Sequence, residues 1–106
     1  MMNSFSDTKP LALNVNKAQR MAEFFRSLGD SSRLRIISLL AQQEYCVGEI
    51  AEIVEMSESA VSHQLRILRS LRVVGYRKEG RKVYYKLLDH HILDLYNSVA
   101  EHLEEE

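Results

Sequence analysis

The spacing of the apolar residues changes near Leu71, and this change restricts the folds that are possible. From residue 47 to residue 71, apolar side chains recur at helical spacing, with one short break before Ser57. From residue 73 to residue 88, in the segment VVGYRKEGRKVYYKLL, they alternate with a period of two. The pattern therefore predicts two short helices joined by a tight turn and followed by a β-hairpin.

The expected bounds of these elements follow from their local residues. The first helix is predicted from about residue 47 to residue 54, and the second opens at Ser57, a favourable capping residue. The hairpin is predicted to turn near Glu79–Gly80. Two helices of this kind form a helix-turn-helix, and the hairpin that follows would make it a winged helix. The second helix has a strong apolar stripe, made by Val61, Leu65, Leu68 and Leu71.

Helices are also expected on both sides of this motif. One runs from about residue 16 to Gly29, which ends it. The next begins at Asp30, Ser31 or Ser32. Its predicted buried stripe is Leu34, Ile37, Leu40 and Ala41. A closing helix has apolar residues along one side, namely Ile92, Leu95, Tyr96, Val99 and Leu103.

These elements predict a mainly α fold with a β-hairpin wing, formed by one domain over residues 16–106 after a flexible arm at residues 1–15. A chain of 106 residues buries only a modest core, so a second copy is expected to complete it. We expect a homodimer that pairs through the N- and C-terminal helices.

The charge is unevenly distributed, although the net charge is only −1. Residues 61–86 contain eight Lys and Arg residues and a single acidic residue, Glu79. A local basic segment in a nearly neutral chain indicates an anion site, and double-stranded DNA is the leading candidate. The alternative is a solvated charged surface.

The second helix of the motif carries the short polar side chains that a recognition helix needs near its N-terminus. Ser57 would cap it, although capping could be its whole role, and His63 could instead be a packed or solvated histidine. Arg66 and Arg69 lie further along, where phosphates would be reached. Together with the basic residues of the wing, the predicted DNA-binding set is Ser57, Ser59, Ser62, His63, Gln64, Arg66, Arg77, Lys78, Arg81 and Lys82.

Several classes of protein are disfavoured. No apolar run is long enough to span a bilayer, and the first residues lack the pattern of a signal peptide, so we expect a cytoplasmic protein without a membrane partner. The single cysteine, Cys46, rules out a thiolate-cluster metal site within one chain. We find no nucleophile motif or Gly-rich phosphate loop, so no enzyme and no small-molecule substrate is expected.

The closing segment DHHILDLYNSVAEHLEEE holds three of the four histidines and six of the fifteen acidic residues. At about 100° per residue, His91, His102 and Glu105 share one helix face, and Asp89 lies where the helix begins. His90 points elsewhere. Histidine and carboxylate are ligands that suit Zn²⁺.

Distance prevents one helix from forming this site alone. Eleven residues separate His91 from His102, or about 16 Å along a helix, whereas zinc ligands lie about 2 Å from the metal. Two antiparallel copies would bring Asp89 and His91 of one chain to His102 and Glu105 of the other, giving two equivalent sites. The alternative is a dimer helix with a solvated polar edge.

Over about residues 18–106 the chain resembles the ArsR/SmtB family of metal-responsive winged-helix repressors, and within it the zinc-sensing branch. The resemblance is carried by the segments FFRSLGDSSRLRIISLL, EYCVGEIAE, SESAVSHQLRILRSLRVVGYRKEGRKVYYKL and DHHILDLYNSVAEHLEE. It implies zinc ligands at Asp89, His91, His102 and Glu105, with cobalt as a plausible surrogate. It also implies a metal-free dimer that binds an inverted-repeat operator and leaves it when zinc binds.

The same resemblance implies a route of coupling, in which metal-bound His102 contacts the backbone near Arg72, just after the recognition helix. Some members of the family have a second site that uses a CVC-like segment and an N-terminal arm. Here only Cys46 and Glu49 remain of it, and the arm has neither Cys nor His. These two residues are either a weak remnant or an ordinary part of the fold, with Cys46 as a small packed residue. A DNA-binding regulator controlled by another metal, or by none, is the competing function.

Overall fold

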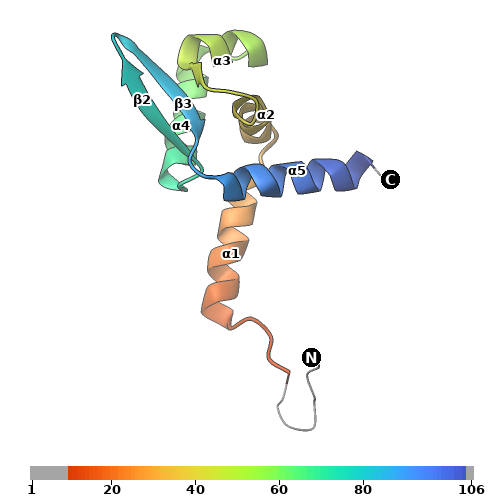
Figure 1. Cartoon of the computed structure of the whole chain (residues 1–106). Coiled ribbons are helices and arrows are strands. Elements are labelled where there is room, and N and C mark those ends of the chain that lie inside the picture. Colours follow the sequence, from red (N-terminus) through yellow and green to blue (C-terminus); the bar gives the residue numbers. More distant parts are fainter. Residues whose placement is uncertain (1–9, 105–106) are drawn as a thin grey trace.

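The structure is a computed structural model that describes residues 10–104. Three helices pack together against the base of a small three-stranded sheet, and the hairpin of that sheet and two further helices project from this centre (Figure 1). The elements in chain order are α1 (Val15–Leu28), α2 (Ser31–Leu40), β1 (Tyr45–Cys46), α3 (Val47–Val54), α4 (Glu58–Ser70), β2 (Val74–Glu79), β3 (Lys82–Leu87) and α5 (His90–Glu104).

The hydrophobic core lies where α2, α3 and α4 meet the base of the hairpin. Its innermost side chains come from these three helices and from the residue just before β2. Because each of them leaves water almost completely, each stabilises the fold by about 1.5–3 kcal/mol before entropy is counted. They are Ile36, Ile37, Ile50, Val61, Leu65, Leu68 and Val73.

The helix-turn-helix is confirmed, with bounds close to those expected. The α3 helix spans Val47–Val54 and ends at Glu55, which adopts a left-handed conformation with φ of 60°. Ser57 caps α4, since its side chain accepts a hydrogen bond from the Ala60 N–H at 3.1 Å. Asp30 is the cap of α2, because its carboxylate accepts from the Arg33 N–H at 3.1 Å. These short polar residues satisfy backbone donors that the first turn leaves unpaired.

The hairpin wing is also confirmed. In the antiparallel β2–β3 pair, Glu79 faces Lys82, and Gly80 lies in the turn with φ of 63°. Strand β1 pairs with β3, and Tyr45 faces Tyr85. We did not expect β1, because a strand of two residues has no period that a sequence can display.

The predicted buried stripe of α2 was partly wrong. Ile37 and Leu40 are buried as expected, but Leu34 is 41% exposed, and Ile36 and Leu39 are buried in addition. The reason is that the first turn of α2 does not face the core. Leu34 instead lines an apolar groove between α1 and α5.

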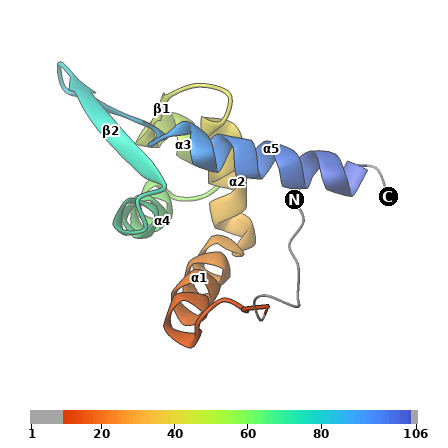
Figure 2. The same ribbon diagram turned by 60° about the horizontal axis from the view of Figure 1, so that its bottom comes forward.

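Helices α1 and α5 extend away from the rest of the chain (Figures 1 and 2). Leu28 is the one buried residue of α1, and α5 has none. The groove between them has a volume of about 340 Å³ and is lined by apolar residues that include Phe25, Tyr96 and Leu103. No helix within residues 10–104 is long and apolar enough to cross a membrane.

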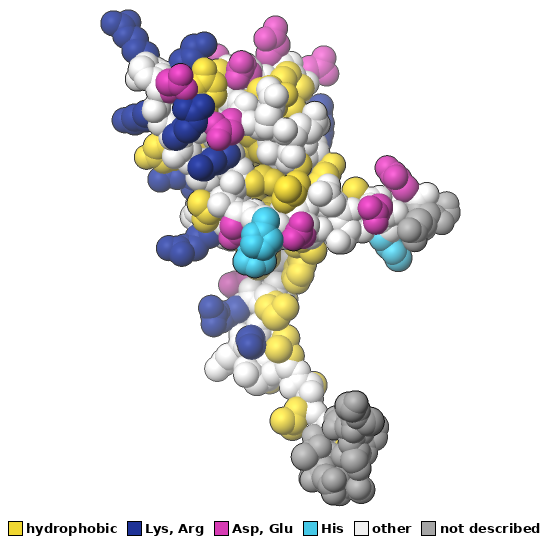
Figure 3. Space-filling view, viewed as in Figure 1, with side chains coloured by type: hydrophobic (Ala, Val, Ile, Leu, Met, Phe, Trp, Pro, Cys, Tyr) yellow, Lys and Arg dark blue, Asp and Glu magenta, His cyan; other side chains and the backbone are white. Residues whose placement is uncertain are grey.

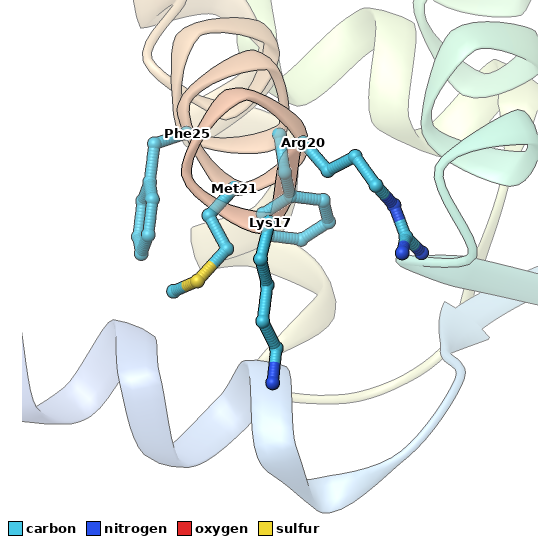
Figure 4. A pocket seen from close by; sticks show the side chains of 5 residues that line it. Lys17, Arg20, Met21 and Phe25 are labelled. Atoms are coloured by element: carbon cyan, nitrogen blue, oxygen red, sulfur yellow. The ribbon is translucent and has the colours of Figure 1, made fainter. Parts of the chain in front are cut away.

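A second hollow lies on α1 itself, where two basic side chains lie beside three large apolar ones (Figure 4). Met21 and Phe25 are 44% and 51% exposed on this helix, and Lys17 and Arg20 stretch away from it. Large apolar side chains are therefore open to solvent both on α1 and in the groove beside it. A face of this kind on a small domain usually binds another protein surface.

Candidate nucleic-acid interface and candidate metal site

One face of α4 collects the polar side chains expected of a recognition helix. Ser59, Ser62, His63 and Arg66 follow the helical spacing i, i+3, i+4 and i+7 and therefore share a face. His63 and Arg66 are exposed, and Ser62 is half-buried. The opposite face holds the buried residues of α4, so the polar face is directed outwards. It is suited to enter a groove of DNA.

Gln64 lies apart from this set. It is about 140° from Ser59 around the helix axis. Its side-chain oxygen accepts a hydrogen bond from the Nε of Arg33 on α2, at 2.7 Å. Gln64 is therefore turned toward α2 and not, as expected from its place in the sequence, toward the groove-facing residues.

The wing presents basic side chains beside its turn. Lys78, Arg81 and Lys82 are exposed there. Lys and Arg side chains gather on the side of the molecule formed by the hairpin and α4, whereas α5 carries acidic and histidine side chains (Figure 3). The uneven charge of the sequence thus becomes, in the fold, a basic surface over the hairpin and α4 and an acidic, histidine-bearing surface on α5.

Arg77 is held by contacts within the domain itself. Its Nε donates to Glu44 at 2.7 Å, its Nη1 donates to Glu79 at 2.6 Å, and its guanidinium lies 4.9 Å from the centre of the Tyr84 ring. The hydrogen bonds to Glu79 and then Glu44 raise the pKa of Arg77 above its usual value. Two carboxylates therefore offset the charge of a residue that was predicted to contact DNA.

The junction between α4 and the wing is a tight turn with an unusual backbone. Arg72 has φ of 62°, its N–H donates to the Arg69 carbonyl, and the Val73 N–H donates to the Leu68 carbonyl, each at 2.9 Å. This pair of bonds is a Schellman motif, in which glycine is the usual residue at the left-handed position. Nearby, the guanidinium of Arg69 lies 4.4 Å from the centre of the Tyr76 ring and ties α4 to β2. The turn thus fixes how the wing leaves the recognition helix.

At the start of α5, two of the predicted metal ligands are close together. The Asp89 carboxylate accepts the His91 N–H at 2.9 Å and lies 3.4 Å from the His91 Nδ1. Partial desolvation opposes ionisation of Asp89, but the hydrogen bonds and the charge of His91 outweigh it and lower the pKa of Asp89. A carboxylate that stays ionised and an imidazole beside it are a suitable pair of zinc donors.

The other predicted ligands lie elsewhere. His102 is exposed in the last turns of α5, away from Asp89 and His91, and Glu105 falls outside the described residues. Histidine side chains accordingly gather at the two ends of α5 in Figure 3. Within residues 10–104 of one chain, no three His, Cys, Asp or Glu side chains form a metal-binding group. No hydrogen bond between His102 and Arg72 occurs in this part of the chain.

Cys46 and Glu49 have a structural role at the start of α3. The Glu49 carboxylate accepts the Cys46 N–H at 2.9 Å, and the Cys46 side chain faces the Glu49 N–H in a capping box. The Cys46 backbone N–H, followed by its side chain, lowers the pKa of Glu49. These contacts support the reading of the two residues as part of the fold.

The fold and its basic face define a winged helix-turn-helix of the DNA-binding regulator class. The family model described as "Bacterial regulatory protein, arsR family" matches residues 30–76. The chain is 57% identical to a transcriptional repressor SmtB homolog of Synechocystis, over 92% of this chain and 74% of the relative. It is 40% identical to a cadmium resistance transcriptional regulatory protein CadC homolog of Staphylococcus aureus, over 80% and 71%.

Solved structures agree with this assignment. The solution structure of apo-NmtR is similar with a TM-score of 0.79 and 36% identity, over 93% of this chain and 84% of the other. The homodimeric winged helix-turn-helix domain Mb0332 of Mycobacterium bovis gives a TM-score of 0.76 and 31% identity, over 92% and 96%. The chain belongs to the ArsR family of transcriptional regulators, which are DNA-binding proteins and not enzymes.

Proposed function

We propose that this chain is a zinc-released transcriptional repressor. Its metal-free homodimer binds an operator with inverted half-sites, through α4 and the wing. Zn²⁺ at two sites between the subunits weakens DNA binding and releases genes for metal efflux or sequestration. As a regulator of DNA, the protein works in the cytoplasm.

The arrangement of histidines on α5 is the observation that carries this proposal. Asp89 and His91 form a donor pair at one end, and His102 lies at the other end. These ends are about 16 Å apart, so a four-ligand site needs His102 and Glu105 from a second subunit. Two histidines and two carboxylates suit Zn²⁺, and Co²⁺ is the natural surrogate for spectroscopy.

The apolar groove supports the same dimer. Val99 and Leu103 of α5 and Phe25 of α1 are 49%, 57% and 51% exposed in the single chain. Pairing of α1 and α5 with a second copy would remove these side chains from water, at about 25 cal/mol per Å² of apolar surface. It would also place the two α5 helices side by side, as the shared metal site requires.

The metal would act on DNA through the subunit contact. His102 of one subunit would hold zinc with one ring nitrogen and reach the backbone at Arg72 with the other. Arg72 lies in the turn that fixes the wing to α4, so a contact there can alter the DNA-binding face. Second-shell bonds of this kind transmit the state of a ligand, and the coupling must be reciprocal.

The competing function is a winged-helix regulator that answers to another metal, or to none. A structural neighbour with 25% identity and a TM-score of 0.73 is an antimony-specific repressor, so metals other than zinc occur among proteins of this fold. The donor set on α5 favours zinc, because it contains imidazole and carboxylate but no thiolate.

The test is DNA binding by fluorescence anisotropy, with and without zinc and with chelator added back. Wild-type protein should bind an imperfect inverted repeat, leave it on addition of zinc, and return with chelator. His102→Ala should bind DNA like the wild type but lose the zinc response. The structure places the His90 ring 4.3 Å from the ring of His91, contrary to the expectation that His90 points elsewhere. The matched control is therefore Asn97→Ala, since this exposed residue of α5 lies more than about 100° around the helix from both His91 and His102 and should keep the response. Release of the His102→Ala protein by zinc would contradict the proposed site.

A further inference from the structure

The side chain of Arg33 links three helices. Its backbone N–H is held by the cap residue Asp30 in the first turn of α2. Its Nη1 donates to the Ser27 carbonyl in the last turn of α1 at 2.6 Å, and its Nε donates to the Gln64 side chain on α4 at 2.7 Å. A guanidinium is a planar, rigid fork, so these two bonds fix α1 and α4 relative to each other.

The α1 end of this link lies where that helix joins the domain. The Gly29 N–H bonds to the carbonyls of Phe25 and Arg26, and the Ser27 carbonyl is left for Arg33. A positive charge at this position also complements the C-terminal end of the helix dipole. Since Leu28 is the one buried residue of α1, the Arg33 bond lies beside the main apolar anchor of the helix.

At the α4 end of the link, the bond to Arg33 limits the ability of Gln64 to contact a DNA base. Recognition of adenine by glutamine uses both the oxygen and the nitrogen of the amide, which must face the base. Here the oxygen faces Arg33, and the side chain is half-buried beside α2. Gln64 is therefore directed toward the helix that positions α4, and away from the face that holds Ser59 and His63.

We propose that Arg33 and Gln64 are a pair of positioning residues, which transmit the placement of α1 to the recognition helix. Because α1 borders the groove that faces a second subunit, a change in pairing would alter α4 through this link. The proposal requires that α4 bind DNA, but it does not require the metal site. Loss of the zinc response alone would not contradict this inference. Failure of the wild-type protein to bind any operator would contradict the proposed function, on which the inference rests.

The first test is a double-mutant cycle with Arg33→Gln, Gln64→Ala and the combined variant. Each single change should weaken operator binding about tenfold, because a bond to a charged donor is lost. The combined variant should bind no worse than either single one, since both changes break the same link. Preference among operators with single base-pair changes should stay as in the wild type.

The matched control is Arg35→Gln on the same helix. Arg35 donates to the Val54 carbonyl of α3 at 2.8 Å, so its replacement removes the same charge from α2 without touching the link to α4. This variant should combine additively with Gln64→Ala. Additive effects of Arg33→Gln and Gln64→Ala, or a base preference altered by Gln64→Ala, would overturn the proposal.

The second test measures α1 when only α4 is changed. Amide hydrogen exchange at Leu28 and Gly29 should be about tenfold faster in DNA-free Gln64→Ala than in the wild type, because the link no longer holds the end of α1. Gln64→Glu keeps an acceptor for Arg33 and should restore slow exchange. Unchanged exchange in Gln64→Ala would overturn the proposal, and this measurement remains decisive even if Arg33→Gln fails to fold.

Discussion

At the scale of single residues, several side chains serve the fold where the sequence suggested a binding role. Gln64 binds Arg33, Arg77 binds two carboxylates, and Glu49 caps α3 with Cys46. Arg33 and Glu44 lie more than 30 residues away in the chain from Gln64 and Arg77, so the sequence did not reveal these contacts, whereas Glu49 and Cys46 are only three residues apart and form a local cap. Ser57 and Asp30 were easier to predict, because capping depends on neighbours within the same turn.

The left-handed residue Arg72 provides a stability test at this scale. Arg72→Gly should raise the free energy of unfolding by up to about 1 kcal/mol, since relief of a left-handed β-carbon exceeds the extra freedom of unfolded glycine. The midpoint of urea denaturation at fixed protein concentration measures this change. Arg72→Ala is the control, because it removes the charged side chain but keeps the strain. An equal gain from Arg72→Ala would show that backbone conformation is not the cause.

At the scale of elements, the two periodicities of the sequence predicted α3, α4 and the hairpin with close bounds. Local patterns suffice there, because each of these elements buries one face against the same core. The exposure of Leu34 could not be predicted from its spacing, since it depends on where α1 and α5 lie. The same limit applies to Arg33, whose partners lie on two other helices, 6 and 31 residues away in the chain.

The ion pairs that hold Arg77 in the wing can be tested through DNA binding. Replacing both Glu44 and Glu79 by glutamine should tighten operator binding and steepen its salt dependence by about one unit of slope, because Arg77 becomes available to a phosphate. Anisotropy titrations between low and moderate salt measure both quantities. Glu23→Gln on α1 removes a carboxylate far from the wing and serves as the control. A slope equal to that of the wild type would mean that Arg77 does not reach DNA when released.

At the scale of the whole molecule, the DNA face and the apolar groove lie on different parts of one small domain (Figure 3). The distribution of charge and the winged fold were predictable from the sequence. The metal site was predictable only as a set of residues, because its completion depends on a second chain. Residues 1–9 of the arm predicted over residues 1–15, and the ligand Glu105, lie outside the described residues, and their roles stay predictions.

The groove supplies the prediction for the dimer. Phe25→Glu places a charge among apolar side chains that pairing would bury, so it should yield a monomer and weaken operator binding by at least tenfold. Light scattering after size-exclusion chromatography measures the mass. Ile53→Glu is the matched control: Ile53 is 48% exposed on α3, does not line the groove, and should leave the dimer intact. A dimeric Phe25→Glu protein would place the interface elsewhere.

The sparse burial of α1 and α5 has a consequence for how the protein behaves in a cell. A helix with at most one buried residue gains little from its own chain, so its order depends on a partner. Ordering of these two helices is then coupled to dimer formation, which depends on protein concentration. The melting temperature should therefore rise with protein concentration. In a cell that makes little of this regulator, the protein would lose folded structure and the control of its genes together. The amount synthesised would then itself set the threshold for repression.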